Sequence, residues 1–158
     1  MTNSLNLREM ALEILLEVEK NGAYPNVLLK QTLDKYLYME KQERAFLTRL
    51  VEGTVERKLT LEYMIDQVSK TPVRKMKPVI RCIMRMAAYQ IFYMDSVPDS
   101  ADCDEAVKLA KKKGFQTLKG FVNGVLRNLS RQKEEILLPD EKKDPVKAAL
   151  VDMTKLNL

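Results

Sequence analysis

Residues 79–92 read VIRCIMRMAAYQIF, and this stretch decides the fold. Arg81 and Arg85 are its only charged residues, so a helix over it is apolar almost all round. Such a helix is typical of the centre of a core, where neighbours cover it on every side. Lys77 and Pro78 precede it, and proline is favoured in the first turn of a helix. The stretch therefore predicts a central buried helix that begins near residue 77.

The segments on both sides carry apolar residues at helical spacing, and none shows the alternation of a β-strand. Glycine and proline mark the breaks between them, for example at Gly22, Pro25 and Gly114. We predict seven helices, over about residues 7–21, 25–33, 40–57, 61–68, 77–92, 100–112 and 115–135. The predicted fold class is therefore all-α.

Two glycine-containing segments are similar at an offset of 71 residues. Residues 50–57 read LVEGTVER, and residues 121–128 read FVNGVLRN. Glycine inside a helix costs about 1 kcal/mol relative to alanine, so we expect Gly53 and Gly124 each to allow close approach of another group. This similarity between the two segments has two explanations. One is chance similarity between amphipathic helices, and the other is a fold of two similar helical halves packed together.

Positive charge is concentrated in one part of the chain. Residues 71–133 hold 13 Lys or Arg and 5 Asp or Glu, a net charge of +8, whereas residues 1–70 carry −1 and residues 134–158 carry −2. Clustered cations favour polyanionic partners, because each neutralised phosphate releases condensed counterions. Aromatic residues make up only 6% of the chain. Recognition of RNA or DNA through backbone and shape is therefore favoured over base stacking or base readout.

The candidate RNA-binding residues are cations near the start of the chain, around the central helix and in the last two predicted helices. They are Arg8, Arg74, Lys75, Lys77, Arg81, Arg85, Lys111, Lys112, Lys113, Lys119, Arg127 and Arg131. Whether they converge on one face depends on the fold.

The same cations could instead have structural roles. Arg81 and Arg85 are able to pair with carboxylates on neighbouring helices, since unpaired burial of charge is costly. The lysines at 111–113 also gain from the negative end of a helix dipole. A second helix packed on Gly120 and Gly124 would leave the arginines of the last predicted helix in solvent.

Composition excludes several kinds of active site. The chain has no His, which removes the usual catalytic triads, imidazole bases and histidine-bound zinc. Its two Cys cannot form a Cys-rich zinc site, and its five Gly form no phosphate-binding loop. We therefore predict no catalytic residue and no metal site.

The expected compartment follows from targeting signals and cysteine use. No run reaches the roughly 18 apolar residues of a membrane span, and the first residues lack the layout of a signal peptide. We predict a cytoplasmic protein without a membrane partner, in which Cys82 and Cys103 do not form a disulfide.

Three motifs give the chain a family resemblance. They are Phe121-Val-Asn-Gly-Val-Leu126, Arg44-Ala-Phe-Leu47 with Leu50-Val-Glu-Gly53, and Arg85-Met-Ala-Ala-Tyr-Gln-Ile-Phe-Tyr93 followed by Val97-Pro98. Over about residues 5–136 the chain resembles the NusB-like helical RNA-binding domain. Asn6-Leu7-Arg8 and Asn123-Gly-Val-Leu-Arg127 are most similar to the amino-terminal domain of Sun/Fmu-type (RsmB-like) ribosomal RNA cytosine-C5 methyltransferases. The transcription antitermination factor NusB is the second candidate.

This resemblance implies a fold and a role. Residues 1–137 would form two packed antiparallel helical bundles. The residues themselves predict a linker or tail over 138–158, where prolines at 139 and 145 and the helical spacing of apolar residues after them leave open a short helix or a disordered tail. The partner would be RNA, expected to be ribosomal, and the module would help a methyltransferase catalytic domain in the same chain engage it. The alternatives are a stand-alone antitermination or ribosome-assembly factor that binds RNA with a ribosomal protein, and a helical module that docks on an acidic protein.

The resemblance also bears on cofactors. In the full-length methyltransferases, a further domain binds S-adenosylmethionine and supplies cysteine nucleophiles, one of them in a Pro-Cys motif. Here Cys82 follows Arg81 and Cys103 follows Asp102, so neither matches that motif. We expect no cofactor in this chain, and S-adenosylmethionine only where a catalytic domain is attached.

Overall fold

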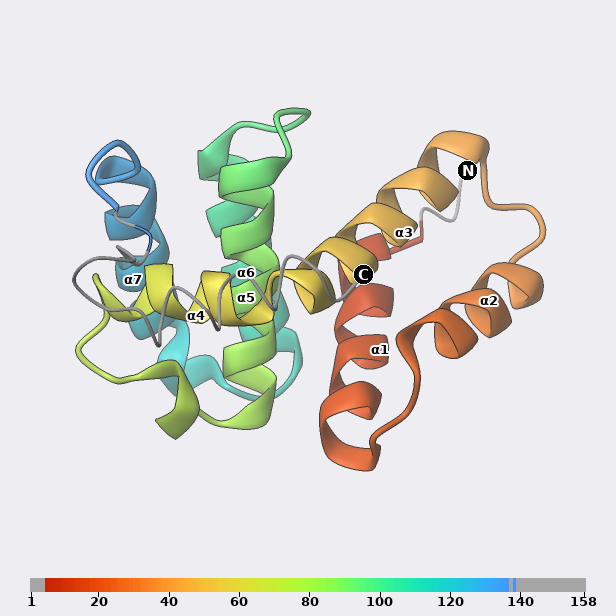
Figure 1. Cartoon of the computed structure of the whole chain (residues 1–158), viewed down its shortest axis with the longest axis horizontal. Coiled ribbons are helices and arrows are strands. Elements are labelled where there is room, and N and C mark those ends of the chain that lie inside the picture. The colour runs from red at the N-terminus through yellow and green to blue at the C-terminus, as the bar shows by residue number, and fades with distance from the viewer. Residues whose placement is uncertain (1–4, 137, 139–158) are drawn as a thin grey trace.

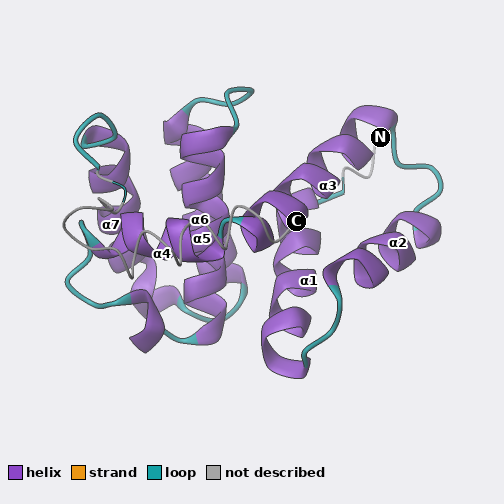
Figure 2. Ribbon diagram, viewed as in Figure 1, coloured by secondary structure: helices purple, strands orange, loops and turns teal. Residues whose placement is uncertain are grey.

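The computed structural model describes residues 5–136 and residue 138, and within them every regular element is helical (Figures 1 and 2). The α-helices are α1 (Leu7–Asn21), α2 (Pro25–Lys35), α3 (Lys41–Glu56), α4 (Lys58–Asp66), α5 (Pro78–Tyr93), α6 (Asp99–Lys112) and α7 (Lys119–Arg131), and the 3₁₀ turns are η1 (Val73–Lys75) and η2 (Gln116–Leu118). The predicted all-α fold is confirmed.

Local signals explain where these helices begin and end. Asn6 caps α1, because its side-chain oxygen accepts the backbone N–H of Glu9 at 3.0 Å. Gly22 follows α1 with φ of 66°, a left-handed conformation that favours glycine. Pro25 and Pro78 occupy the first turns of α2 and α5.

The helices form two packed groups that share α5. Helices α1, α2 and α3 pack on one another, and helices α4 to α7 form a second group, on the left in Figure 1. Helix α5 packs in the second group and also contacts α1 and α3. Every residue from Cys82 to Ile91 is buried, so the predicted central buried helix is confirmed.

The end of the chain differs from the prediction. The seventh helix was expected over residues 115–135, but η2 occupies 116–118 and α7 runs only from Lys119 to Arg131. Leu118, the last residue of η2, has φ of −98° and ψ of 3°, away from α-helical values, and it marks the break between η2 and α7. Apolar spacing continues through both elements, which is why the sequence pattern did not locate the break.

The predicted tail lies almost wholly beyond the described part of the chain. Apart from Leu138, the tail and its short helix fall outside the described residues. The domain boundary at 137 therefore stays a prediction.

The two aligned glycines have different surroundings. A Cβ at Gly53 would lie 2.1 Å from Cζ of Tyr89, so α3 and α5 are close because Gly53 has no side chain. At Gly120 and Gly124, by contrast, no described atom lies within 4 Å of an added Cβ. The predicted close approach is confirmed at Gly53 and is wrong at Gly124 within the described residues. The alternative of a second helix packed on Gly120 and Gly124 is likewise wrong there, because α7 packs through its opposite, apolar face.

Two further observations bear on the sequence predictions. No helix among the described residues is long and apolar enough to cross a membrane. Cys82 and Cys103 are both buried and free, and burial raises the pKa of the Cys82 thiol to about 11. A thiol with so high a pKa is protonated at neutral pH and is therefore a poor nucleophile.

Candidate nucleic-acid interface

The topology brings three helix ends together. Short links, residues 94–98 and 113–118, join α5 to α6 and α6 to α7, and the helices of each pair pack on one another. Packed neighbours with short connections run antiparallel. The start of α5, the end of α6 and the start of α7 therefore lie at one end of the second group, with η1 just before α5 (Figure 1).

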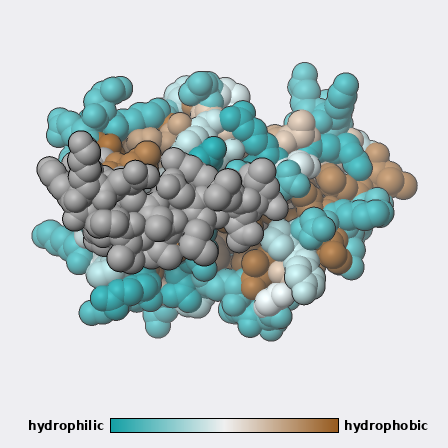
Figure 3. Space-filling view, viewed as in Figure 1, coloured by the Kyte–Doolittle hydropathy of each residue, from teal (hydrophilic) through white to brown (hydrophobic). Residues whose placement is uncertain are grey.

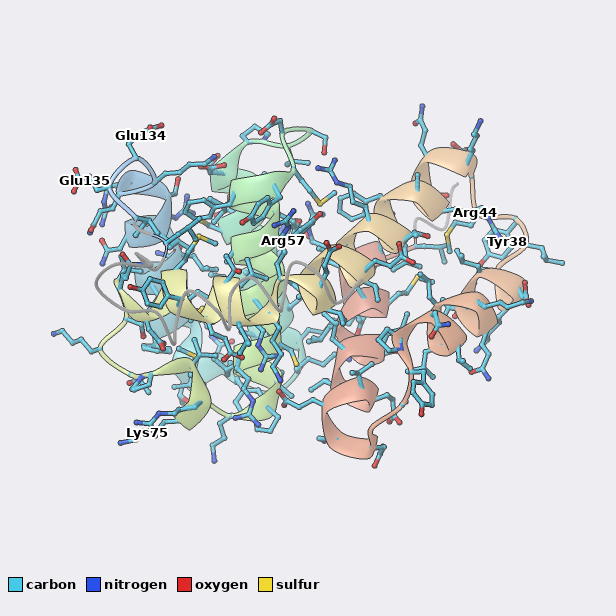
Figure 4. All side chains as sticks on the ribbon, viewed as in Figure 1. Tyr38, Arg44, Arg57, Lys75, Glu134 and Glu135 are labelled. Atoms are coloured by element: carbon cyan, nitrogen blue, oxygen red, sulfur yellow. The ribbon has the colours of Figure 1, made fainter. Side chains whose placement is uncertain are left out.

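Exposed cations gather at this end. We call it the basic end and define it by Arg74, Lys75, Lys77, Lys111 and Lys119. All of these side chains are exposed, and none forms an ion pair within the part of the chain that the structure describes. The basic end is at the lower left in the figures. Figure 3 shows hydrophilic side chains along this edge, and in Figure 4 Lys75 points away from the body of the molecule. Residues 67–94 and 106–133, which supply the basic end, contain no Asp or Glu.

Arg81 and Arg85 point into the molecule and are neutralised there. Glu19 Oε1 accepts hydrogen bonds from Arg81 Nε and Arg85 Nη2, each at 2.9 Å. Arg85 Nε also lies 3.0 Å from Glu62 Oε2, and the Arg85 side chain is only 7% exposed. Burial opposes ionisation of Glu19, but hydrogen bonds from both arginines outweigh it and keep its pKa below the usual value. In the structure, Arg81 and Arg85 therefore have the structural role considered above, in which they pair with carboxylates on neighbouring helices.

The lysines at the end of α6 are divided between two roles. Lys111 belongs to the basic end, whereas Lys112 lies 2.7 Å from Glu9 Oε1 and Lys113 lies 3.0 Å from Glu9 Oε2. Hydrogen bonds from Lys112 and Lys113 lower the pKa of Glu9. These ion pairs attach the end of α6 to α1. Of the three lysines, Lys111 is therefore the most available to bind a phosphate, and Lys112 is available in part.

The arginines of α7 also contact neighbouring side chains. Arg127 pairs with Asp104 of α6 at 2.6 Å and donates to Asn123 at 3.0 Å. Arg131 is exposed and donates to Asn128. Both remain on the exposed side of α7 with Gly120 and Gly124, as the helical spacing predicts, but Arg131 lies at the opposite end of α7 from Lys119.

Arg8 is the last sequence candidate, and it lies apart from the basic end. Its Nε donates to Gln90 at 2.7 Å, and its Nη2 lies 3.4 Å from Asp102 Oδ1. The guanidinium carbon is 5.2 Å from the centre of the Phe46 ring. Arg8 thereby connects α1 with α3, α5 and α6.

Asp102 is a buried carboxylate in this contact. It is 1% exposed, and its Oδ2 accepts no hydrogen bond from the described residues. Burial raises its pKa to about 6, although Arg8 attracts the charged form. Asp102 is therefore partly protonated just below neutral pH.

The raised pKa predicts a pH dependence of stability. Because the folded state holds the Asp102 proton more tightly than the unfolded state, whose pKa is near 3.8, stability should fall as pH rises from about 4 to about 6. The slope is of the order of 1 kcal/mol per pH unit. Urea unfolding of the parent and of Asp102→Asn at each pH measures it, since the difference between them cancels the opposite contributions of Glu9 and Glu19. Identical pH profiles for the two proteins would rule the effect out.

Two surface arginines were not selected from the sequence. Arg49 and Arg57 lie in the part of the chain with net charge −1, so the charge distribution did not point to them. Neither forms an ion pair within the described residues. No pattern in the sequence singled them out: Arg49 lies on α3, and Arg57 directly follows its last residue, Glu56.

Comparison with known proteins places this fold in a family. The model of the NusB family matches residues 5–131. This chain belongs to the NusB family. Two solved structures have the same fold: one described as antitermination factors NusB and NusE in complex with dsRNA, with a TM-score of 0.71 at 21% identity over 79% of this chain and 93% of that one, and T. maritima NusB, with a TM-score of 0.72 at 23% identity over 82% and 93%. The predicted NusB-like fold is confirmed.

The relatives of this NusB-family chain are named either as ribosomal RNA methyltransferases or as transcription antitermination proteins. A "Probable ribosomal RNA small subunit methyltransferase B" from Bacillus subtilis (strain 168) is 39% identical over 142 residues, which are 90% of this chain but 31% of the relative. Its namesake from Synechocystis sp. is 35% identical over 83% of this chain and 29% of the relative. A "Transcription antitermination protein NusB" from Pelotomaculum thermopropionicum is 36% identical over 81% of this chain and 89% of the relative. The chain thus spans about a third of the first two relatives and most of the third.

Proposed function

We propose that this chain is an RNA-binding module, not catalytic by itself, that helps a ribosomal RNA cytosine-C5 methyltransferase engage its RNA. The basic end carries the proposal, because its cations are exposed and free of carboxylate partners among the described residues. Such cations are available to displace counterions from phosphates. The basic end lies where several helix ends meet, and phosphate contacts made there would position the RNA without reading its sequence.

The comparisons support the methyltransferase part of this proposal. Relatives that carry the methyltransferase name are matched by this chain over only 31% and 29% of their length, which leaves room for a catalytic domain in the same polypeptide. We propose that S-adenosylmethionine binds to that domain and not to this chain, whose glycines form no phosphate-binding loop and whose thiols are buried. The native RNA would be ribosomal.

A second candidate is a stand-alone antitermination or ribosome-assembly factor. It is favoured by the relative from P. thermopropionicum, which this chain covers over 89% of its length. A structural neighbour is described as NusB and NusE in complex with dsRNA, which supports a second protein partner in this case, and the resemblance implies that this partner is a ribosomal protein. The length of the native polypeptide separates the candidates, because a methyltransferase should be more than about twice as long as this chain.

Salt dependence tests the RNA-binding proposal directly. If about four phosphates are neutralised, affinity for single-stranded RNA should fall with a log–log slope of about −3, or roughly 50-fold between about 50 and 200 mM salt. Replacing Lys75 and Lys77 with alanine should flatten the slope by about 0.7 for each phosphate that is no longer neutralised, with little sequence preference. Fluorescence anisotropy of a labelled oligonucleotide measures both quantities.

A matched control removes charge elsewhere. Lys30→Ala also deletes an exposed lysine, but Lys30 lies on α2 and pairs with Asp34 at 2.8 Å. Its salt slope should equal that of the parent. If the folded Lys75→Ala/Lys77→Ala variant binds as tightly and as salt-sensitively as the parent, the basic end is not the RNA site, and docking on an acidic protein becomes the better account of its charge.

A further inference from the structure

Arg49 and Arg57 converge on one tyrosine, where α3 passes beside α5. Arg49 Nη2 donates to the backbone carbonyl of Tyr93, the last residue of α5. The guanidinium carbon of Arg57 lies 4.4 Å from the centre of the Tyr93 ring. Eight residues of α3 separate the two Cα atoms by about 12 Å, yet both side chains reach Tyr93. Arg57 lies near the middle of the face shown in Figure 4.

The Tyr93 ring belongs to a stack. The rings of Tyr89 and Tyr93 have centres 5.3 Å apart and planes inclined by 25°. Tyr89 in turn fills the space that Gly53 leaves on α3. The Tyr93 ring therefore contacts both the Tyr89 ring and the Arg57 guanidinium. The buried Tyr89 and the partly buried Tyr93 thus support a guanidinium that is itself partly exposed.

The positive charges of Arg49 and Arg57 are not compensated by carboxylates. Four other arginines of the described chain contact one: Arg8, Arg81, Arg85 and Arg127. Arg49 and Arg57 do not, although Glu52 and Glu56 of α3 are near them in the sequence. Arg49 is exposed and Arg57 is partly exposed, so both are accessible from solvent. Only one of the five N–H donors of Arg49 is used by the Tyr93 carbonyl.

We propose that Arg57, backed by Tyr93 and Tyr89, is a stacking platform for an unpaired base of single-stranded RNA, and that Arg49 binds a neighbouring phosphate. Unstacked bases lie on guanidinium planes as well as on aromatic rings, and an aromatic ring behind a guanidinium fixes its plane. A duplex cannot use the platform, because its bases are already stacked on one another. The inference rests on the proposed RNA-binding function and adds to it a preference for unpaired RNA.

Arg57→Lys is the sharpest variant, since lysine keeps the positive charge but has no planar group to stack on a base. Its affinity for single-stranded RNA should fall roughly tenfold, the scale of one stacking contact, with the salt slope unchanged. Its affinity for a duplex of the same sequence should stay that of the parent. A 2-aminopurine in the single strand should change its fluorescence on binding to the parent and much less with the variant. Lys30→Ala is again the control, and thermal melting verifies that each protein is folded.

A second measurement needs no variant. Ultraviolet cross-linking of 4-thiouridine RNA to the parent, followed by peptide mass spectrometry, should yield cross-links in peptides that contain Arg57 or Tyr93. Cross-links confined to the basic end, or unchanged single-strand affinity of folded Arg57→Lys, would overturn the stacking platform while the proposed function stands. A parent protein that binds no RNA would overturn both.

Discussion

Replacing Arg85 with alanine is expected to lower the free energy of unfolding by about 3–5 kcal/mol, the range found when one partner of a buried ion pair is removed. The Arg85 side chain is 7% exposed and lies 2.9 Å from Glu19 of α1 and 3.0 Å from Glu62 of α4. In its absence Glu62 has no cation partner in the described structure, and Glu19 keeps only Arg81. Urea unfolding followed by circular dichroism measures the decrease.

Arg81→Ala is the matched control, because Arg81 lies one turn earlier on α5 and binds the same Glu19 oxygen. Its side chain is 24% exposed, so its pair resembles a surface salt bridge and its removal should cost at most about 1 kcal/mol. Neither substitution should change the salt slope of RNA binding by the folded fraction. Equal destabilisation by the two substitutions, or a flatter salt slope for folded Arg85→Ala, would contradict the structural role and return Arg85 to the RNA site.

The sequence was most informative where the physical signal is local. The break at Gly22 and the prolines that open α2 and α5 each act within a few residues. The burial of α5 could also be predicted, because a helix without a polar face has no side that favours contact with solvent. These signals were enough to predict the helices and the fold class.

The candidate site was harder, because it depends on contacts between distant residues. Spacing placed Arg81 and Arg85 on one face of α5, but only the fold brings Glu19 to them from 62 and 66 residues away. Lys112 and Glu9 are separated by 103 residues. Net charge did not reveal Arg49 and Arg57 either, because their segment is balanced by acidic residues that do not pair with them. The net charge of a segment therefore finds a basic region but cannot separate free cations from neutralised ones.

Gly53→Ala is expected to destabilise the protein by about 1–3 kcal/mol, although alanine is the better helix former. The new methyl group would lie 2.1 Å from Cζ of Tyr89, whose ring is 6% exposed and stacked on Tyr93. The buried ring cannot simply turn aside, so either it or α3 must move. Gly124→Ala, at the aligned position of α7, meets nothing within 4 Å among the described residues and should stabilise by about 1 kcal/mol.

A double-mutant cycle identifies the cause of the Gly53 effect. If the clash with the Tyr89 ring is responsible, adding Gly53→Ala to a Tyr89→Ala background should no longer destabilise, and the helix preference of alanine should emerge as a gain of about 1 kcal/mol. Urea unfolding of the four proteins measures the coupling. A Gly53→Ala penalty that persists without the Tyr89 ring would mean that the glycine serves the backbone of α3 itself. In that case the Tyr89, Tyr93 and Arg57 stack would not depend on the absence of a side chain at residue 53.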